Sequence, residues 1–259
     1  MFPIKHQLLK FSLPSILGSA LLLASAVLPA SAFQLRPISR TFAPSGNGST
    51  QSYDIVNDSD EPLAVELSVL NRQMDLDGVE TQTAADDDFL IYPSQIVLNP
   101  GETQAVRVTW LGDPQPKTEL AYRLVAAQVP VELDTPQTNE TKPVGAVKVM
   151  LRYVGSVYIH PENTAPKVVL DSITPRTDAN GTGLEITLNN QGNARAFLKD
   201  FRLHLVSSTG TPMEVTPEQL KDISNTTILA GHQRRYFLPY PDAASVNPTS
   251  ATFEFDSDS

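Results

Sequence analysis

The sequence predicts an all-β fold made of two immunoglobulin-like β-sandwich domains, set at an angle with a cleft between them. Short runs rich in Val, Ile, Leu, Thr and Phe alternate along the chain with turn residues such as Gly, Pro, Asn and Asp. The pattern contains no amphipathic helix of convincing length. About seven such runs precede position 160 and about six follow it, as two immunoglobulin-like sandwiches require.

Residues 1–32 have the pattern of a signal peptide. A basic start with Lys5 and Lys10 precedes a long apolar run, and the small residues 30–32 provide a cleavage site before Phe33. The run is long enough for an uncleaved anchor, but the small residues favour cleavage. We therefore expect an exported chain that is not embedded in a membrane after signal cleavage.

Charge and cysteine content exclude several classes of function. The formal charge of the chain is −10, and removal of the two signal lysines leaves −12. A chain this acidic predicts no nucleic-acid partner. The sequence has no cysteine, which excludes disulfides, thiol catalysis and cysteine-ligated metal sites.

The sequence also lacks recognisable catalytic and metal-binding motifs. The four histidines, His6, His160, His204 and His232, have no metal-ligand spacing. Gly-rich phosphate loops, nucleophile elbows and zinc-protease motifs are missing from the sequence, and the acidic run 86–88 is typical of a solvated loop. We expect no enzyme activity, no cofactor, no metal and no ATP. An exported enzyme whose carboxylates converge from distant strands stays an alternative.

A short segment rich in proline separates the two sets of runs. Pro161 and Pro166 fix the local backbone, which indicates a stiff linker. We therefore predict a signal peptide over 1–32, an immunoglobulin-like domain over 33–160 and a second β-sandwich domain over 161–259.

The stretch 143–161 predicts one long strand that ends at a His-Pro hinge. Val147, Val149 and Leu151 alternate along one face, and Arg152 lies on the other. A strand this apolar is ordinarily covered by its own protein, but here it follows a polar loop and precedes the linker. This arrangement favours a strand that pairs with another protein. In the alternative interpretation, these side chains cover the core of their own domain.

Several segments, in their shared order, resemble the PapD-like periplasmic pilus chaperones, and specifically the archaic (non-classical) branch of that family. The likeness covers residues 33–259. Its segments are the strand that carries Arg40, Phe89–Pro93, Leu98–Gly101, Glu119–Leu124, the strand that ends at Pro161, Leu188–Asn193 and Ile228–Pro239. The resemblance implies a periplasmic chaperone that binds pilus or fimbrial subunits by donor-strand complementation and delivers them to an outer-membrane usher. Val147, Val149 and Leu151 are then the donor-strand side chains.

The resemblance also implies a pair of basic residues that holds the terminal carboxylate of the subunit. Arg40 matches the basic position on the first strand. The family's second basic position falls on Ser156, so Arg152, which has the same strand parity, is our candidate for it. Arg36 is the alternative to Arg40 on the first strand.

Near the hinge, the resemblance implies an ion pair between the two domains. Glu119 matches the acidic member, and His160 stands where the family has its arginine partner. Because histidine titrates near neutral pH, we expect this pair to depend on pH.

A rival interpretation from another functional class is an exported structural or adhesive component of a fimbria or surface. Such a subunit carries a donor extension at its own amino end. The segment from Phe33 to Arg40 is short for that role, so the chaperone interpretation is favoured.

Overall fold

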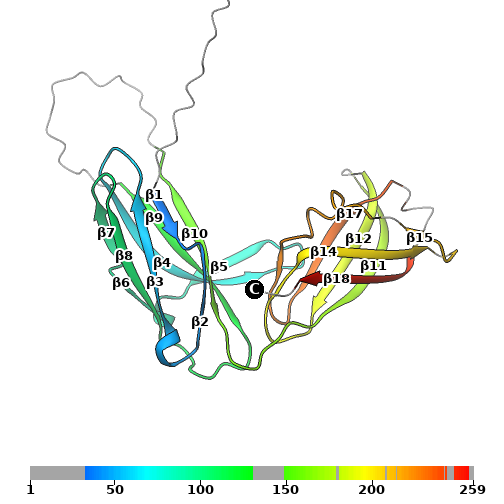
Figure 1. The fold of residues 1–259 in the computed structure, drawn as a ribbon, viewed down its shortest axis with the longest axis horizontal. Coiled ribbons are helices and arrows are strands. Elements are labelled where there is room, and N and C mark those ends of the chain that lie inside the picture. Colours follow the sequence, from blue (N-terminus) through cyan, green and yellow to red (C-terminus); the bar gives the residue numbers. More distant parts are fainter. Residues whose placement is uncertain are drawn as a thin grey trace, which may run out of the picture. The chain divides into compact units, whose positions relative to one another are not determined.

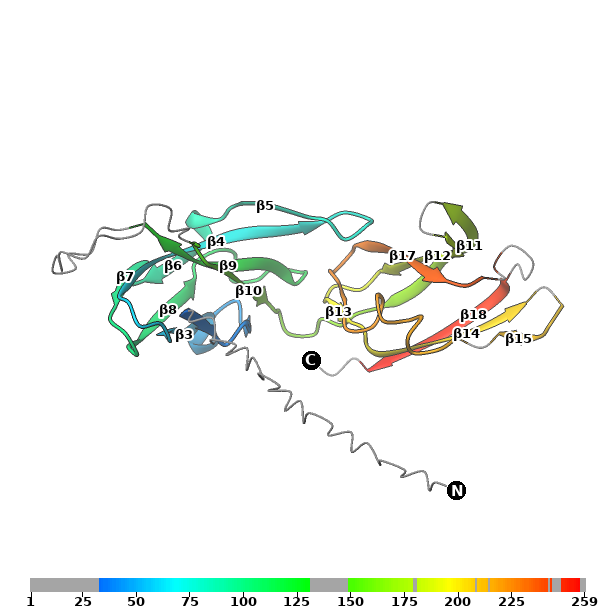
Figure 2. The same cartoon turned by 90° about the horizontal axis from the view of Figure 1, so that it is seen from above.

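The strands form two groups, one on each side of position 160 (Figures 1 and 2), and each group encloses its own hydrophobic core. The computed structural model describes residues 33–130, 149–178, 181–207, 209–213, 215–241, 243 and 248–256. These residues form strands joined by turns and short helical segments, so the all-β prediction is confirmed. The domain limits at 33–160 and 161–259 stay predictions.

The first core lies between two sheets. Its strands are β1 (Phe33–Arg36), β2 (Ser39–Phe42), β3 (Thr50–Asn57), β4 (Leu63–Met74), β5 (Glu80–Ala84), β6 (Phe89–Tyr92), β7 (Gln95–Leu98), β8 (Thr103–Trp110), β9 (Leu120–Val129) and β10 (Arg152–Ile159), with 3-10 helices η1 (Gly46–Ser49) and η2 (Asp86–Asp88). One sheet has the order β1-β3-β8-β6. The other has the order β2-β10-β9-β4-β5, and β7 also pairs with β4.

Alternating side chains explain why these strands form a sandwich. Val106, Val108 and Trp110 of β8 are buried, whereas the residues between them are exposed or half-buried. Leu124 of β9 and Val157 of β10 enter the same core from the second sheet. Each fully buried side chain of this kind stabilises the fold by about 1.5–3 kcal/mol, so the apolar face of each strand fixes which side turns inward.

The first segment of the sandwich changes sheets at Pro37. β1 pairs antiparallel with β3 in one sheet, and β2 pairs in parallel with β10 in the other. The parallel ladder begins where Ser39 lies opposite Ser156, and it covers only Ser156–Ile159 of β10. The segment that the sequence analysis treated as one first strand is therefore two strands, because proline has no N–H with which to continue the ladder.

Strand β10 begins at Arg152, so the longer strand predicted from the sequence was wrong for the residues just upstream. Residues 131–148, where that strand was expected to begin, lie outside the described residues. The ladder with β9 continues for one residue, where the N–H of Gln128 donates to the C=O of Leu151 at 2.9 Å. If the same register continued two residues further upstream on this side, Val149 would lie opposite Pro130, which has no N–H to donate.

The second core is built from strands that follow position 160. They are β11 (Val168–Asp178), β12 (Gly181–Asn190), β13 (Ala196–Phe197), β14 (Lys199–Ser207), β15 (Pro212–Met213), β16 (Thr227–Ile228), β17 (Gln233–Pro239) and β18 (Pro248–Asp256). Their sheets have the orders β11-β12-β17, β13-β16 and β15-β14-β18. Apolar residues from all three sheets meet in one cluster, so this half is also a sandwich.

A fully buried asparagine braces each sandwich in the same way. Nδ2 of Asn57, at the end of β3, lies within hydrogen-bond distance of three backbone carbonyls, including that of Leu98 at 3.2 Å. Nδ2 of Asn190, at the end of β12, also reaches three, including that of Ile228 at 3.2 Å. Both side chains are 0% exposed, so each amide links several backbone segments in a place that water does not reach.

We predict that Asn57→Ala destabilises the chain by about 2–3 kcal/mol, because the substitution removes the side-chain hydrogen bonds to backbone carbonyls and to the N–H of Ser59. Chemical denaturation measures the change. The matched control is Asn47→Ala, at an exposed position in η1, which should alter the free energy of unfolding by less than about 0.5 kcal/mol. Equal effects of the two substitutions would contradict the bracing role.

Candidate functional site

Among the residues that the structure describes, no strand pairs with the edge of β10 that faces away from β9 upstream of Ser156. On that edge the N–H of Ser156 donates to the C=O of Ile38 at 2.8 Å, while the C=O of Leu151 accepts from β9 on the other edge. Because successive residues of a strand point their backbone groups to opposite edges, those of Arg152 and Val154 point away from β9. Within the described ranges, β2 pairs with β10 only from Ser156 onward. Arg152 and Val154 therefore offer their N–H and C=O groups to an added strand.

Apolar side chains accompany this open edge. Val149 is 69% exposed, and Ile38, just before β2, is 53% exposed. Leu151 and Tyr153 are half-buried and pack against the first core. Of the three predicted donor side chains, Val149 is available to a partner, Leu151 already contacts its own sandwich, and Val147 lies outside the described residues.

Arg40 lies on the core-facing side of β2. It is paired with Val157, whose side chain is fully buried, and laterally paired residues share a face of the sheet. Its Nη2 donates to the C=O of Ser52 at 3.4 Å, and its buried Nε has no hydrogen-bond partner among the described residues. Burial raises the pKa of the neighbouring Tyr53, and the positive charge of Arg40 offsets only part of that rise.

Arg152 lies on the opposite face of the sheet from Arg40. It has the strand parity of Tyr158, whereas Arg40 is paired with Val157. Arg152 is exposed, and it lies five residues upstream of Val157, which is about 16 Å along a strand. The register therefore does not bring the two predicted anchor residues together on one face. Arg36, the alternative to Arg40, is exposed in β1, where it donates to a neighbouring glutamine at 2.8 Å.

An ion cluster that the sequence analysis did not identify lies on the face of this sheet that points away from the core, which we call the outer face. Glu80 of β5 accepts from Arg72 of β4 at 2.7 Å and from Nε of Arg123 of β9 at 2.9 Å. Arg72 also donates to the hydroxyl of Tyr158 at 2.9 Å, and Arg123 donates to the hydroxyl of Ser156 at 2.5 Å. Residues from four strands meet here, so only the register reveals the cluster.

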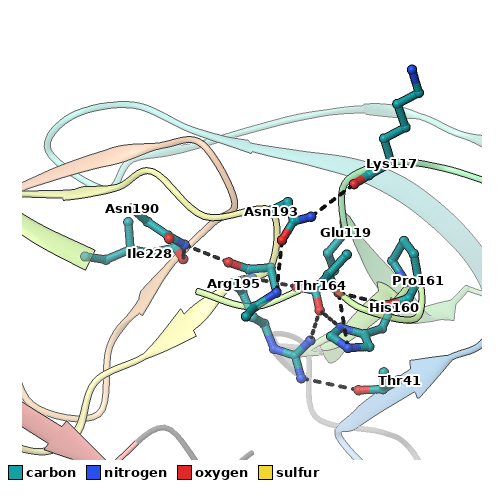
Figure 3. Close-up of polar contacts among 12 residues, drawn as sticks. Thr41, Lys117, Glu119, His160, Pro161, Thr164, Asn190, Asn193, Arg195 and Ile228 are labelled. Atoms are coloured by element: carbon teal, nitrogen blue, oxygen red, sulfur yellow. Dashed lines mark hydrogen bonds and ion pairs between the residues drawn. The ribbon is translucent and has the colours of Figure 1, made fainter. Parts of the chain in front are cut away.

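Glu119 joins the two sandwiches (Figure 3). Its Oε2 lies 2.6 Å from Nδ1 of His160 and 2.6 Å from Nη1 of Arg195, and its Oε1 accepts from the backbone N–H of Arg195 at 3.1 Å. The backbone N–H of Glu119 donates to the C=O of Asn193 at 2.9 Å. Only 2% of the Glu119 side chain is exposed, so these partners have to compensate the loss of hydration.

Arg195, from the second sandwich, also contacts two strands of the first. Its guanidinium lies 3.8 Å from the ring centroid of Tyr158, and its Nη2 donates to Oγ1 of Thr41 at 3.3 Å. The sequence predicted a pair between Glu119 and His160, and the structure has these two side chains in contact. Their role at a hinge stays a prediction. Arg195 was not predicted as a partner, because no local pattern indicates which residue of a distant strand approaches a given carboxylate.

The described residues contain no group of three or more His, Asp or Glu side chains that could hold a metal ion. Within the same residues, no helical segment has the length and hydropathy of a membrane span.

A cavity of about 310 Å³ lies beside Glu119. Arg72 and His232 also line this cavity.

Comparison with protein families accounts for the first sandwich. Residues 40–165 match the family model of the pili and flagellar-assembly chaperone, PapD N-terminal domain. The chain contains a PapD-like chaperone domain. The matched segment includes the open edge of β10 as well as Arg40, Glu119 and His160. No curated protein sequence matches the chain.

Solved chaperone structures share the PapD-like fold over most of the chain. The class 5 fimbriae chaperone CfaA aligns with a TM-score of 0.55 at 17% identity, over 88% of this chain and 93% of CfaA. A chain from a structure of a chaperone–tip adhesin complex in CFA/I fimbriae biogenesis aligns with a TM-score of 0.52 at 16% identity, over 82% of this chain and 87% of that one. The YadV chaperone aligns with a TM-score of 0.50 at 12% identity, over 86% and 91% of the two chains. At these identities the likeness is one of fold.

We predict that Glu80→Gln makes stability less sensitive to acid. Burial raises the pKa of Glu80, but the hydrogen bond from Arg123 and the charges of Arg72 and Arg123 outweigh burial and hold the pKa below its ordinary 4.5. The ionised carboxylate therefore stabilises the fold above that ordinary value, and the contribution is lost as the pH falls through the folded-state pKa. The melting temperature of the wild-type chain should exceed that of the variant at neutral pH, with a gap that narrows as the pH falls below 4.5.

Thermal denaturation by circular dichroism over this range of pH measures the gap. Glu218→Gln, at an exposed position, is the control, and its melting temperature should follow that of the wild-type chain at each pH. A gap for Glu80→Gln that stays constant down to the lowest pH would show that the carboxylate charge is not responsible.

We further predict that Glu119→Ala destabilises the chain by about 3 kcal/mol, because it leaves the Arg195 guanidinium, whose side chain is 13% exposed, without its counter-charge. Chemical denaturation measures the loss. Glu254→Ala is the control, since the Glu254–Arg202 pair is 4.0 Å apart and about 70% exposed, and its effect should stay below about 0.5 kcal/mol. A loss no larger than that of the control would contradict a structural role for the Glu119 junction.

Proposed function

We propose that the chain is a periplasmic chaperone that binds and stabilises pilus or fimbrial subunits by donor-strand complementation and delivers them to an outer-membrane usher. The observation that carries the proposal is the open edge of β10, with the exposed Val149 beside it, in a PapD-like domain. The similarity to CfaA, a fimbriae chaperone, and to a chain from a chaperone–tip adhesin complex supports it. The signal-like residues 1–32 support export.

The physical basis is the completion of an unfinished sandwich. A subunit that lacks one strand exposes core side chains and unpaired backbone groups, and both promote aggregation. The backbone groups of Arg152 and Val154 can supply the missing hydrogen bonds, each worth about 0.5–1.5 kcal/mol net. Burial of Val149 in the subunit adds about 1.5–3 kcal/mol. Leu151 adds less, because its own sandwich already covers part of it.

Capture of this kind requires no chemical step. Hydrogen bonds and apolar contacts made by a lent strand can be made equally by another strand, so a competing strand can release the subunit without ATP. The chaperone is therefore proposed to be a binding protein rather than an enzyme, which acts without a cofactor or a metal ion.

Recognition of the subunit's terminal carboxylate is the second part of the proposal. Arg40 is the proposed cation on the first segment, where its buried Nε still needs an acceptor. Arg152 stays a predicted second cation, although it lies on the other face of the sheet.

The rival function, a structural or adhesive fimbrial component, differs in one respect that can be measured: such a component is incorporated into the fibre, whereas a chaperone is not.

We predict that Val149→Thr lowers the recovery of a co-expressed subunit several-fold without a change in the melting temperature of the free chaperone, because Val149 is exposed in the free chain. Leu151→Thr should lower both quantities, because Leu151 also packs against its own core. Affinity purification of the tagged chaperone with pilus subunits encoded beside its gene measures recovery.

The matched control is Val97→Thr, a 57% exposed position on β7, which should leave recovery unchanged. Full recovery with Val149→Thr would argue against the open edge as the capture site. Presence of the chain itself in isolated fibres would favour the rival function.

A further inference from the structure

The hairpin formed by β4 and β5 ends in a tightly bonded turn, Asp75–Val79, which we call the tip. The N–H of Asp75 donates to the C=O of Val79 at 3.0 Å, and the N–H of Gly78 donates to the C=O of Asp75 at 3.0 Å. Oδ1 of Asp75 also accepts from the backbone N–H of Asp77 at 3.0 Å and from that of Val79 at 2.8 Å. These four hydrogen bonds give the tip a defined shape of its own.

The stem of this hairpin is fastened to the first sandwich. The last five residues of β4 pair with β5, and β4 pairs in turn with β9. Glu80, the first residue of β5, accepts from Arg72 at 2.7 Å and from Nε of Arg123 at 2.9 Å. The base of the tip is therefore held by two ion pairs as well as by the backbone ladder, so the tip has a fixed position relative to the first sandwich.

The tip contacts the free edge of β17 in the second sandwich. Among the described residues β17 pairs only with β12, and on its other edge the N–H of Arg235 donates to the C=O of Leu76 at 2.7 Å. The side chain of Arg235 adds a bidentate ion pair with Asp77, in which Nε lies 2.8 Å from Oδ1 and Nη2 lies 2.8 Å from Oδ2. An exposed ion pair alone contributes little, but here the backbone hydrogen bond and the planar fork fix its geometry.

A close fit against Arg234 completes the contact. Gly78 has a φ of +81°, and a Cβ added there would collide with the guanidinium of Arg234. Glycine at this position therefore serves both the left-handed backbone of the turn and the close approach of the arginine. Arg234 is itself held, since its Nη1 donates to the C=O of Thr227 at 3.2 Å and its guanidinium lies 4.9 Å from the ring centroid of Tyr236.

This contact is separate from the junction around Glu119. A cavity of about 310 Å³ is lined by Asn71–Gln73 of the stem as well as by Glu119 and His232, so open space lies between the stem and the junction. The junction alone would leave the second sandwich free to turn about one region. A second contact away from that region opposes such a turn.

We propose that the tip is a second joint between the sandwiches, which docks on the free edge of β17 and fixes the orientation of the second sandwich. Leu76, Asp77 and Gly78 form one side of the joint, and Arg234 and Arg235 form the other. The joint also covers a backbone N–H of an edge strand that another chain could otherwise pair with. It is a property of the free chain. A partner that contacts both sandwiches loses less conformational freedom on binding when their orientation is already fixed.

Distances between two spin labels test the joint. The sequence has no cysteine, so Thr103→Cys on β8 and Thr252→Cys on β18, both at exposed positions, place one label on each sandwich. In the chain without residues 1–32 we expect pulsed electron paramagnetic resonance to give one narrow distance distribution. Asp77→Arg should lower the ratio of docked to undocked chains by about tenfold, the loss of one charge-assisted hydrogen bond. Asp77→Asn, which keeps an acceptor without the charge, should lower it less.

Asp54→Arg, the same charge change at an exposed position on β3, is the control and should leave the distribution narrow. The amide proton of Arg235 should exchange with solvent faster in Asp77→Arg, because Leu76 no longer accepts it, and thermal denaturation checks that each variant is folded. A distribution or an exchange rate that is unchanged in Asp77→Arg would overturn the joint. Equal broadening in Asp54→Arg would overturn it too, as would a wild-type distribution as broad as that of Asp77→Arg.

Discussion

The parallel pairing of β2 with only the last part of β10 is the constraint on which the rest of the site depends. If β2 ran along the whole of β10, the sheet would have no free backbone groups at Arg152 and Val154. If β2 were absent, the edge would be open along its full length and a guest strand would have no defined end point. A strand edge of this kind has free backbone groups over one part of its length and is already paired over the rest.

The crossing of the first segment between sheets produces this half-covered edge. Pro37 interrupts the ladder after β1, and the chain then reaches β10 in the other sheet. The same crossing places Arg40 against the interior and Thr41 on the outer face, where Thr41 accepts a hydrogen bond from Arg195. One short segment therefore shapes the open edge, contributes a cation and contacts the second sandwich.

Two carboxylates fix the outer face of the sheet that carries this edge. Glu80 holds Arg72 and Arg123 across strands β4, β5 and β9, and Glu119 holds His160 and Arg195. Each acid is shared by two cations, so neither cluster is neutral when its members are charged. Tyr158 connects the clusters, since it accepts from Arg72 and lies under the guanidinium of Arg195. Side chains held on several sides in this way lose little further freedom when a partner binds.

The sequence by itself determined the all-β class, the approximate position of the strands and the resemblance to PapD-like chaperones, because strand periodicity and ordered motifs are local properties of the chain. It also placed Glu119 and His160 in the same region, through the resemblance rather than through any local rule. Tertiary structure alone decided where β10 begins, that Leu151 packs inward while Val149 does not, and that Arg40 and Arg152 occupy opposite faces. It also decided that Arg123 and Glu80 form an ion cluster and that Arg195 contacts Glu119. These features follow from register and from contacts between distant strands, and a shift of one residue in register would move each side chain to the other face.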